Sequence, residues 1–146
     1  MNSARRERWE KAFAEEGVVS KSDYNADKRA TIVLEHLMQA SDVAQTMQHW
    51  HVYIKWNEKL FNEMYGAYEA GRLDMDPSIS WYEGEIGFLD YYVIPLANKL
   101  DACGVFGVSS REYLNYAESN RKEWVARGKV IVDEYLQRYN KKHANK

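Results

Sequence analysis

The residues best suited to chemistry are four histidines and a spread of acidic side chains. His49 and His51 flank Trp50, so they fall on different faces of a predicted helix. His36 lies on a predicted apolar face, and His143 lies in a basic tail. A catalytic divalent ion normally takes three or four protein ligands. The histidines therefore do not by themselves predict a metal site.

Asp42 and Cys103 are isolated candidates, each with an ordinary structural interpretation. By its chemistry alone, Asp42 is a helix N-cap or a solvated acid. Cys103 is the single cysteine and cannot form an internal disulfide. We expect it to be a small buried residue rather than a reactive thiol. The cysteine content favours a reducing, intracellular and cytoplasmic setting, although a larger parent protein could be anchored in a membrane.

An apolar stripe is the clearest pattern in the chain. Its members recur every three or four residues, which predicts one helix face ending near Gly71. Such a stripe is either ordinary helix core or the wall of a pocket. Its members are Trp50, Tyr53, Trp56 with Asn57, Leu60, Met64 and Tyr68.

Composition narrows the class of protein. Of 146 residues, 45% are hydrophobic and 29% charged, which is typical of one modest globular domain. The net charge of -2 argues against a nucleic-acid partner. The sequence contains no apolar run long enough to span a bilayer.

The elements that must position these residues are all predicted to be helices, because sustained two-residue alternation is absent. One helix is expected from about Asp27, and another over 81–103 with a kink or break at Pro95. A last helix is expected to begin at Ser109 with a capping box to Glu112. The predicted division is an N-terminal helical or linker segment over 1–27, a domain over 28–137 and a basic, frayed tail over 138–146.

Three motifs occur in an order that resembles the class I cyclic-nucleotide phosphodiesterases. Ala40-Ser41-Asp42 is followed by Trp50 and Trp56, and residues 84–96 read GEIGFLDYYVIPL. Residues 115–124 end in N-R-x-x-W. The resemblance covers roughly residues 28–127, and residues 103–116 are similar to the algal or diatom type. It implies the C-terminal part of an all-α catalytic domain with long helices.

The resemblance also implies chemistry at metal ions. In the family, two divalent ions (Zn and Mg) activate water that hydrolyses a cyclic nucleotide to its 5'-monophosphate. Asp42 matches the last metal-binding aspartate. The H-N-x-x-H and H-D segments and the general-acid histidine would precede it and do not occur in this sequence. We therefore expect this chain alone to be inactive and not to retain the metal ions.

A base pocket is the second implication of the resemblance. Phe88 matches the phenylalanine that clamps the purine, whereas Glu85 replaces the family's glutamine. A carboxylate only accepts hydrogen bonds, which suits the adjacent N1–H and N2–H of guanine and predicts a preference for cGMP over cAMP. Alternatively, Glu85 faces solvent or pairs with a lysine. Other family pocket positions map onto Gln45, Tyr53, Trp56, Leu60 and Met64.

Two functions stay open from the sequence. The chain is either part of a phosphodiesterase, or a non-catalytic helical module that derives from this domain and binds a nucleotide or a partner protein. In the first case its partner is the missing N-terminal part of the catalytic domain or another copy of the chain. An apolar face cut at the metal site would make the isolated chain associate.

Overall fold

The structure is a computed structural model that describes residues 22–104 and 106–144, with side chains from residue 26 onward. Within those ranges the fold is all-α and contains no strand. Residues 1–21 of the predicted N-terminal helical or linker segment lie outside the described residues. The elements are α2 (Ser22–Asp42), η1 (Ala44–Met47), α3 (Trp50–Glu69), α4 (Pro77–Phe88), η2 (Leu89–Val93), α5 (Ile94–Cys103) and α6 (Ser109–His143).

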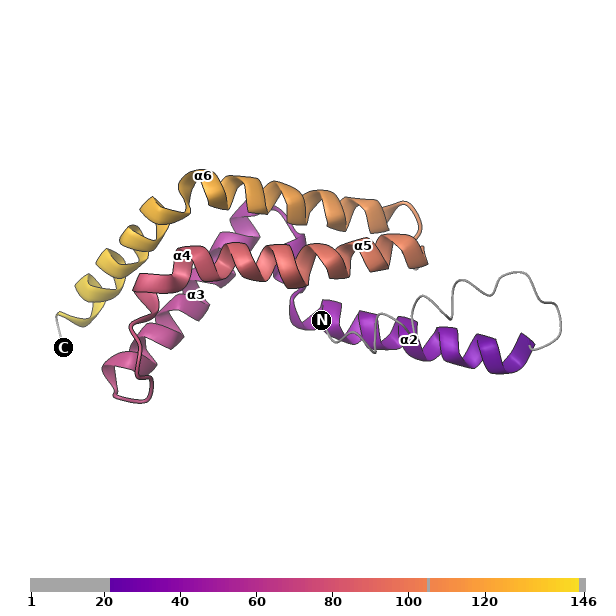
Figure 1. The fold of residues 1–146 in the computed structure, drawn as a ribbon. Helices are drawn as coiled ribbons and strands as arrows, with labels where there is room; N and C mark the ends of the chain where they lie inside the picture. Colours follow the sequence, from indigo (N-terminus) through magenta and orange to yellow (C-terminus); the bar gives the residue numbers. More distant parts are fainter. Residues whose placement is uncertain (1–21, 105, 145–146) are drawn as a thin grey trace.

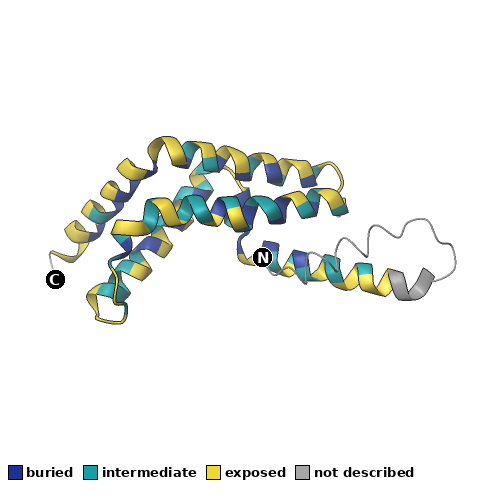
Figure 2. Ribbon diagram, in the orientation of Figure 1, coloured by how far each residue is buried: buried dark blue, intermediate teal, exposed yellow. Residues whose placement is uncertain are grey.

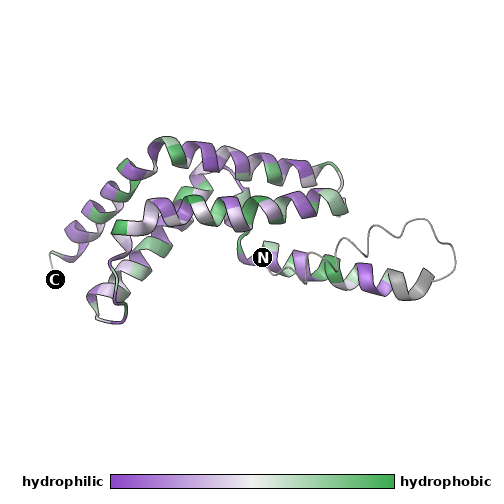
Figure 3. Ribbon diagram, viewed as in Figure 1, coloured by the Kyte–Doolittle hydropathy of each residue, from purple (hydrophilic) through white to green (hydrophobic). Residues whose placement is uncertain are grey.

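The long helix α6 organises the molecule. It contacts α3, α4, α5, η1 and η2, while α2 contacts α5 and projects from the remaining helices (Figure 1). Its exposed residues gather on the side turned away from α4 and α5 (Figure 2), and that outer side is largely hydrophilic (Figure 3). Its inward side buries Asn120, Trp124, Ile131 and Tyr135. The core therefore lies between α6 and the helices beneath it.

The second helix begins earlier than the sequence predicts. α2 begins at Ser22 rather than near Asp27. Polar residues are tolerated in the first turn of a helix. The polar residues before Asp27 therefore fit either a solvent-exposed first turn or a loop, and the sequence does not distinguish the two. Asp42 is the last residue of α2, so its interpretation as an N-cap is wrong.

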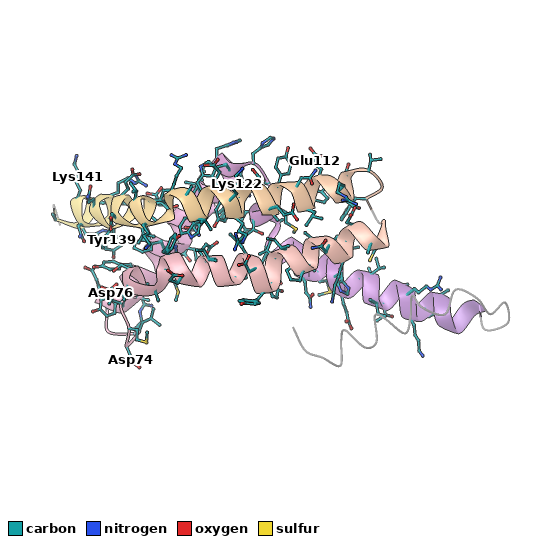
Figure 4. All side chains as sticks on the ribbon, turned by 45° about the horizontal axis from the view of Figure 1, so that its top comes forward. Asp74, Asp76, Glu112, Lys122, Tyr139 and Lys141 are labelled. Atoms are coloured by element: carbon teal, nitrogen blue, oxygen red, sulfur yellow. The ribbon has the colours of Figure 1, made fainter. Side chains whose placement is uncertain are left out.

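A proline-led turn begins α4 before the predicted start at Trp81. Asp76 is the N-cap and accepts a hydrogen bond from the Ser78 backbone N–H at 2.8 Å, with Pro77 as the first helical residue. Figure 4 places Asp74 and Asp76 at this turn, at the same end of the molecule as Tyr139. The preceding helix ends as predicted, because Gly71 takes a φ of 69° just after α3.

The predicted interruption at Pro95 takes the form of a π-helical turn rather than a break. The Ile94 N–H donates to the carbonyl of Leu89, which closes the wider turn η2 just before the proline. Proline lacks an N–H and crowds the carbonyl four residues back, so a π-helical turn absorbs the mismatch. α4, η2 and α5 therefore run as one rod beside α6 (Figure 1).

Both ends of α6 differ in detail from expectation. The helix begins at Ser109 as predicted, but its N-cap is Val108 and no side-chain cap forms, so the capping box is wrong. Ser110 is buried instead and its hydroxyl accepts a hydrogen bond from the Phe106 N–H. At the other end the helix continues to His143, so the predicted fraying from residue 138 is wrong over this stretch. Burial of Tyr139 accounts for the extension.

None of the helices in the described ranges combines the length and apolar character needed to cross a bilayer.

Candidate functional site

A pocket of about 380 Å³ lies between α3, α4 and η1, and we call it the α3–α4 pocket. Helices α3 and α4 contact each other, which brings residues more than twenty positions apart in the chain to one wall. Six of the seven predicted pocket residues line it: Gln45, Tyr53, Trp56, Leu60, Glu85 and Phe88. The others are Thr46, Asn57, Lys59 and Glu63. The structure thus brings together residues that the sequence could place only on separate elements.

Glu85 forms the polar centre of this pocket. The Tyr53 hydroxyl donates a hydrogen bond to Glu85 Oε1 at 2.8 Å. The Asn57 side chain lies near Glu85 and acts to lower the pKa of its carboxyl. The half-buried carboxylate therefore has a hydrogen-bond partner on α3.

The orientation of Asn57 is set by a third residue. The Trp81 indole N–H donates to Asn57 Oδ1 at 3.1 Å. Because that oxygen is engaged, the amide nitrogen of Asn57 is the atom that faces Glu85. Both protein partners of Glu85 are consequently hydrogen-bond donors, and the carboxylate acts as an acceptor toward each.

Burial changes the acidity of both members of the Tyr53–Glu85 pair. Desolvation raises the pKa of Glu85, while the hydrogen bonds from Tyr53 and Asn57 act in the opposite direction. The pKa of the Tyr53 hydroxyl is raised strongly, first by its burial and then by the nearby Glu85. Tyr53 therefore remains a neutral donor across the physiological pH range.

Apolar side chains that are exposed form the outer wall. Trp56 is 51% exposed, Leu60 50% and Phe88 36%. The Lys59 ammonium lies 4.3 Å from the ring centroid of Trp56, and Phe88 stacks on Tyr92. For Trp56 and Leu60 the interpretation as ordinary helix core is wrong, because a core residue is covered on all sides.

The seventh predicted residue, Met64, lies in an adjoining cavity. This cavity of about 460 Å³ is built around residues 73–77 and also contains Trp81 and Gly84. Glu85 lines both spaces, so the two cavities meet at its side chain. Both cavities are lined mainly by apolar surface, but both partners of the Tyr53–Glu85 hydrogen bond line the α3–α4 pocket. We therefore place the candidate site in the latter.

Asp42 stands apart from these cavities as an exposed residue at the C-terminal end of α2. The described part of the chain contains no group of three His, Cys, Asp or Glu residues that could hold a metal ion. One carboxylate does not supply the ligand set of a catalytic divalent ion. The described residues therefore do not form the metal site that the resemblance implies.

The N-R-x-x-W motif ties α6 to the elements of the pocket. Asn120 is buried and its amide donates to the carbonyls of Thr46 at 2.9 Å and Gln48 at 2.8 Å. Arg121 pairs with Asp90, and the buried Trp124 donates to the Tyr82 carbonyl. The three motif residues therefore fix η1, η2 and α4 against one helix.

Sequence reasoning did not assign Asn57, Lys59, Glu63 or Thr46 to the site. Asn57 carried a usable signal, since it is a polar residue within an otherwise apolar stripe. A buried amide in such a position needs hydrogen-bond partners, which points to a polar network. Lys59 and Glu63 carried no comparable signal, because charged residues on a helix are common.

Comparison with known families supports the resemblance. A family model described as 3'5'-cyclic nucleotide phosphodiesterase matches residues 3–105. No curated protein and no solved structure gives a significant match to the chain. The family match covers more than half of the 146 residues and contains the Asp42 and Glu85–Phe88 segments. The chain therefore belongs to the 3'5'-cyclic nucleotide phosphodiesterase family.

Proposed function

We propose that the α3–α4 pocket binds the purine base of a 3',5'-cyclic nucleotide and prefers guanine. The observation that carries this proposal is the Glu85 carboxylate, which faces donors from Tyr53 and Asn57 and lines the pocket. A carboxylate offers about four lone-pair sites. The remaining acceptor sites are available to a ligand in the pocket.

Guanine and adenine differ at the edge that would meet this carboxylate. Guanine presents two adjacent donors, N1–H and N2–H, whereas adenine presents a donor beside an acceptor nitrogen. Hydrogen bonds to a charged group contribute about 1.5–3 kcal/mol. Since 1.4 kcal/mol corresponds to tenfold in affinity, we expect cGMP to bind about tenfold or more tightly than cAMP.

The walls and size of the pocket suit a purine ring. Its volume of about 380 Å³ lies within the range of ~300–1,000 Å³ that small-molecule sites occupy. The exposed rings of Trp56 and Phe88 provide apolar surface against which a planar base can pack. Binding would cover both rings, which are otherwise open to solvent.

Hydrolysis to the 5'-monophosphate is proposed for the complete catalytic domain. Asp42 would be the contribution of this chain to the metal site, together with ligands from the N-terminal part of the domain or from another copy. An aspartate at a helix C-terminus interacts unfavourably with the negative end of the helix dipole. A cation bound beside Asp42 would offset this repulsion. The described residues do not complete this metal site.

Isothermal titration of the chain with cGMP and with cAMP tests the base pocket. Wild type should favour cGMP, and Glu85→Gln should reduce the ratio of the two affinities about tenfold, because an amide serves either base. Glu63→Gln is the matched control, since it makes the same change on the same pocket and should leave the ratio unaltered. Equal wild-type affinities, or an equal effect of the two substitutions, would refute the proposal.

The catalytic part is tested separately by hydrolysis of cGMP with Mg²⁺ and Zn²⁺ supplied. We expect no turnover by the chain alone. Turnover that disappears in Asp42→Ala would contradict this expectation and would show that copies of the chain assemble a metal site between them.

A further inference from the structure

A second pocket lies on the other side of η1, and we call it the η1 pocket. It has a volume of about 240 Å³ and is bounded by α2, η1, α5 and the start of α6. Among the described residues that line it, seven of nine are apolar or aromatic: Leu37, Ala40, Ala44, Met47, Leu100, Phe106 and Tyr113. The remaining two are Ser41 and Gln48.

The pocket has a buried floor and an exposed rim. Ala40, Met47 and Leu100 are buried at the floor. Ser41, Gln48 and Phe106 are exposed and form the rim. The Ser41 hydroxyl already donates to the Met38 carbonyl at 2.7 Å, so it meets the pocket as an acceptor. Water has few partners on such a floor, and apolar cavities of this kind hold apolar molecules.

One wall is aromatic. The rings of Phe106 and Tyr113 lie 5.3 Å apart between centroids at an interplanar angle of 82°. An edge-to-face pair of this kind offers a ring face and a ring edge to a third aromatic ring. A cavity of ~150 Å³ lined by aliphatic and aromatic residues accommodates benzene. The larger η1 pocket has room for two fused rings.

From this geometry we propose that the η1 pocket is a binding site for a small planar aromatic molecule of about indole size. The fused rings lie on the apolar floor against Phe106 and Tyr113, and one polar substituent stays at the rim beside Ser41 and Gln48. This ligand is distinct in class from a cyclic nucleotide, because none of the described residues that line the pocket carries a charge to meet a phosphate.

The site lies directly behind the candidate base pocket. Ala44 and Met47 of η1 face the η1 pocket, whereas Gln45 and Thr46 of the same turn line the α3–α4 pocket. The two pockets therefore share one four-residue wall.

Indole titrated into the full chain, followed by amide NMR shifts, tests the proposal. We expect saturable shifts at residues of the η1 pocket, with a dissociation constant on the order of 0.1–1 mM for a ligand of this size. Ala44→Leu fills the pocket and should weaken binding about tenfold or more. Ala126→Leu makes the same change at an exposed site on α6 and should bind like wild type.

Phe106→Ala provides a second variant if Ala44→Leu does not give a folded spectrum. Phe106 is exposed at 41%, so its removal should leave the fold intact while it weakens indole binding about threefold or more. Shifts that rise without saturation in wild type would overturn the proposal. Equal dissociation constants for Ala44→Leu and Ala126→Leu, or for Phe106→Ala and wild type, would also overturn it.

Discussion

Arg121 and Asp90 form a bidentate ion pair that joins α6 to the π-helical turn before Pro95. Arg121 Nε bonds to one carboxylate oxygen of Asp90, and Nη2 bonds to the other at 2.8 Å. Asp90 belongs to the segment GEIGFLDYYVIPL and Arg121 to the N-R-x-x-W motif. The contact therefore links the second and third motifs of the chain in space.

Removing this pair should lower stability in a salt-dependent way. Both side chains are partly solvent-accessible, at 38% for Arg121 and 30% for Asp90, so ions screen their attraction. A double-mutant cycle of Arg121→Ala and Asp90→Ala by urea unfolding should give a favourable coupling that shrinks as NaCl is raised. Additive effects at low salt would contradict the pairing.

Asn120→Ala should destabilise the chain far more than Asn115→Ala. Truncation of the buried Asn120 leaves the Thr46 and Gln48 carbonyls without their donor, at a cost of about 1–3 kcal/mol. Asn115 is exposed on the same helix, and its replacement should change stability by no more than about 0.5 kcal/mol. Urea unfolding of both variants measures the difference in unfolding free energy. Similar losses of stability in the two variants would contradict a stabilising role for the hydrogen bonds from Asn120 to the Thr46 and Gln48 carbonyls.

Two glycines in helices should respond oppositely to alanine. A Cβ at Gly128 would lie 2.8 Å from Tyr82 Cδ2 and 2.9 Å from Trp124 Cε2, so Gly128→Ala should cost about 1–3 kcal/mol. A Cβ at Gly84 meets no atom within 4 Å. Gly84→Ala should therefore stabilise α4 by up to about 1 kcal/mol. Thermal unfolding of both variants measures these opposite effects. A more stable Gly128→Ala would contradict the prediction and would show that the rings of Tyr82 and Trp124 move to make room for the added methyl group.

Glu85 and Asp90 should give opposite pH dependences of the unfolding free energy. Burial raises the folded-state pKa of Glu85, so its contribution to stability is greatest below the unfolded-state pKa and declines as pH rises through the folded value. The hydrogen bond from Arg121 lowers the pKa of Asp90, so its contribution is present above the unfolded-state pKa and is lost as pH falls through the folded value.

Substitution separates these two effects. Relative to wild type, Glu85→Gln should gain stability as pH rises from the acid range toward neutrality. Over the same range Asp90→Asn should become increasingly less stable than wild type. Urea unfolding at a series of pH values from acid to neutral measures both trends. A difference from wild type that stays constant with pH in either variant would contradict the corresponding assignment.

The sequence by itself determined the helical class and the order of the motifs. Spacings of three and four residues depend only on the pitch of one helix, and Gly71 and Pro95 act on their own backbone. These are local effects, so they can be read without knowledge of neighbours. The last helix also begins at Ser109 as predicted, although the capping box that predicted this start does not form.

Only the tertiary structure decided what each side chain meets. The stripe that begins at Trp50 has one periodicity throughout, yet Tyr53 is buried while Trp56 and Leu60 are exposed pocket wall. The difference arises because α4 and α6 cover one part of the stripe and leave the rest open. Glu85 likewise accepts its hydrogen bond from Tyr53, 32 residues earlier, and this pairing is set by the packing of α3 on α4 rather than by either local sequence.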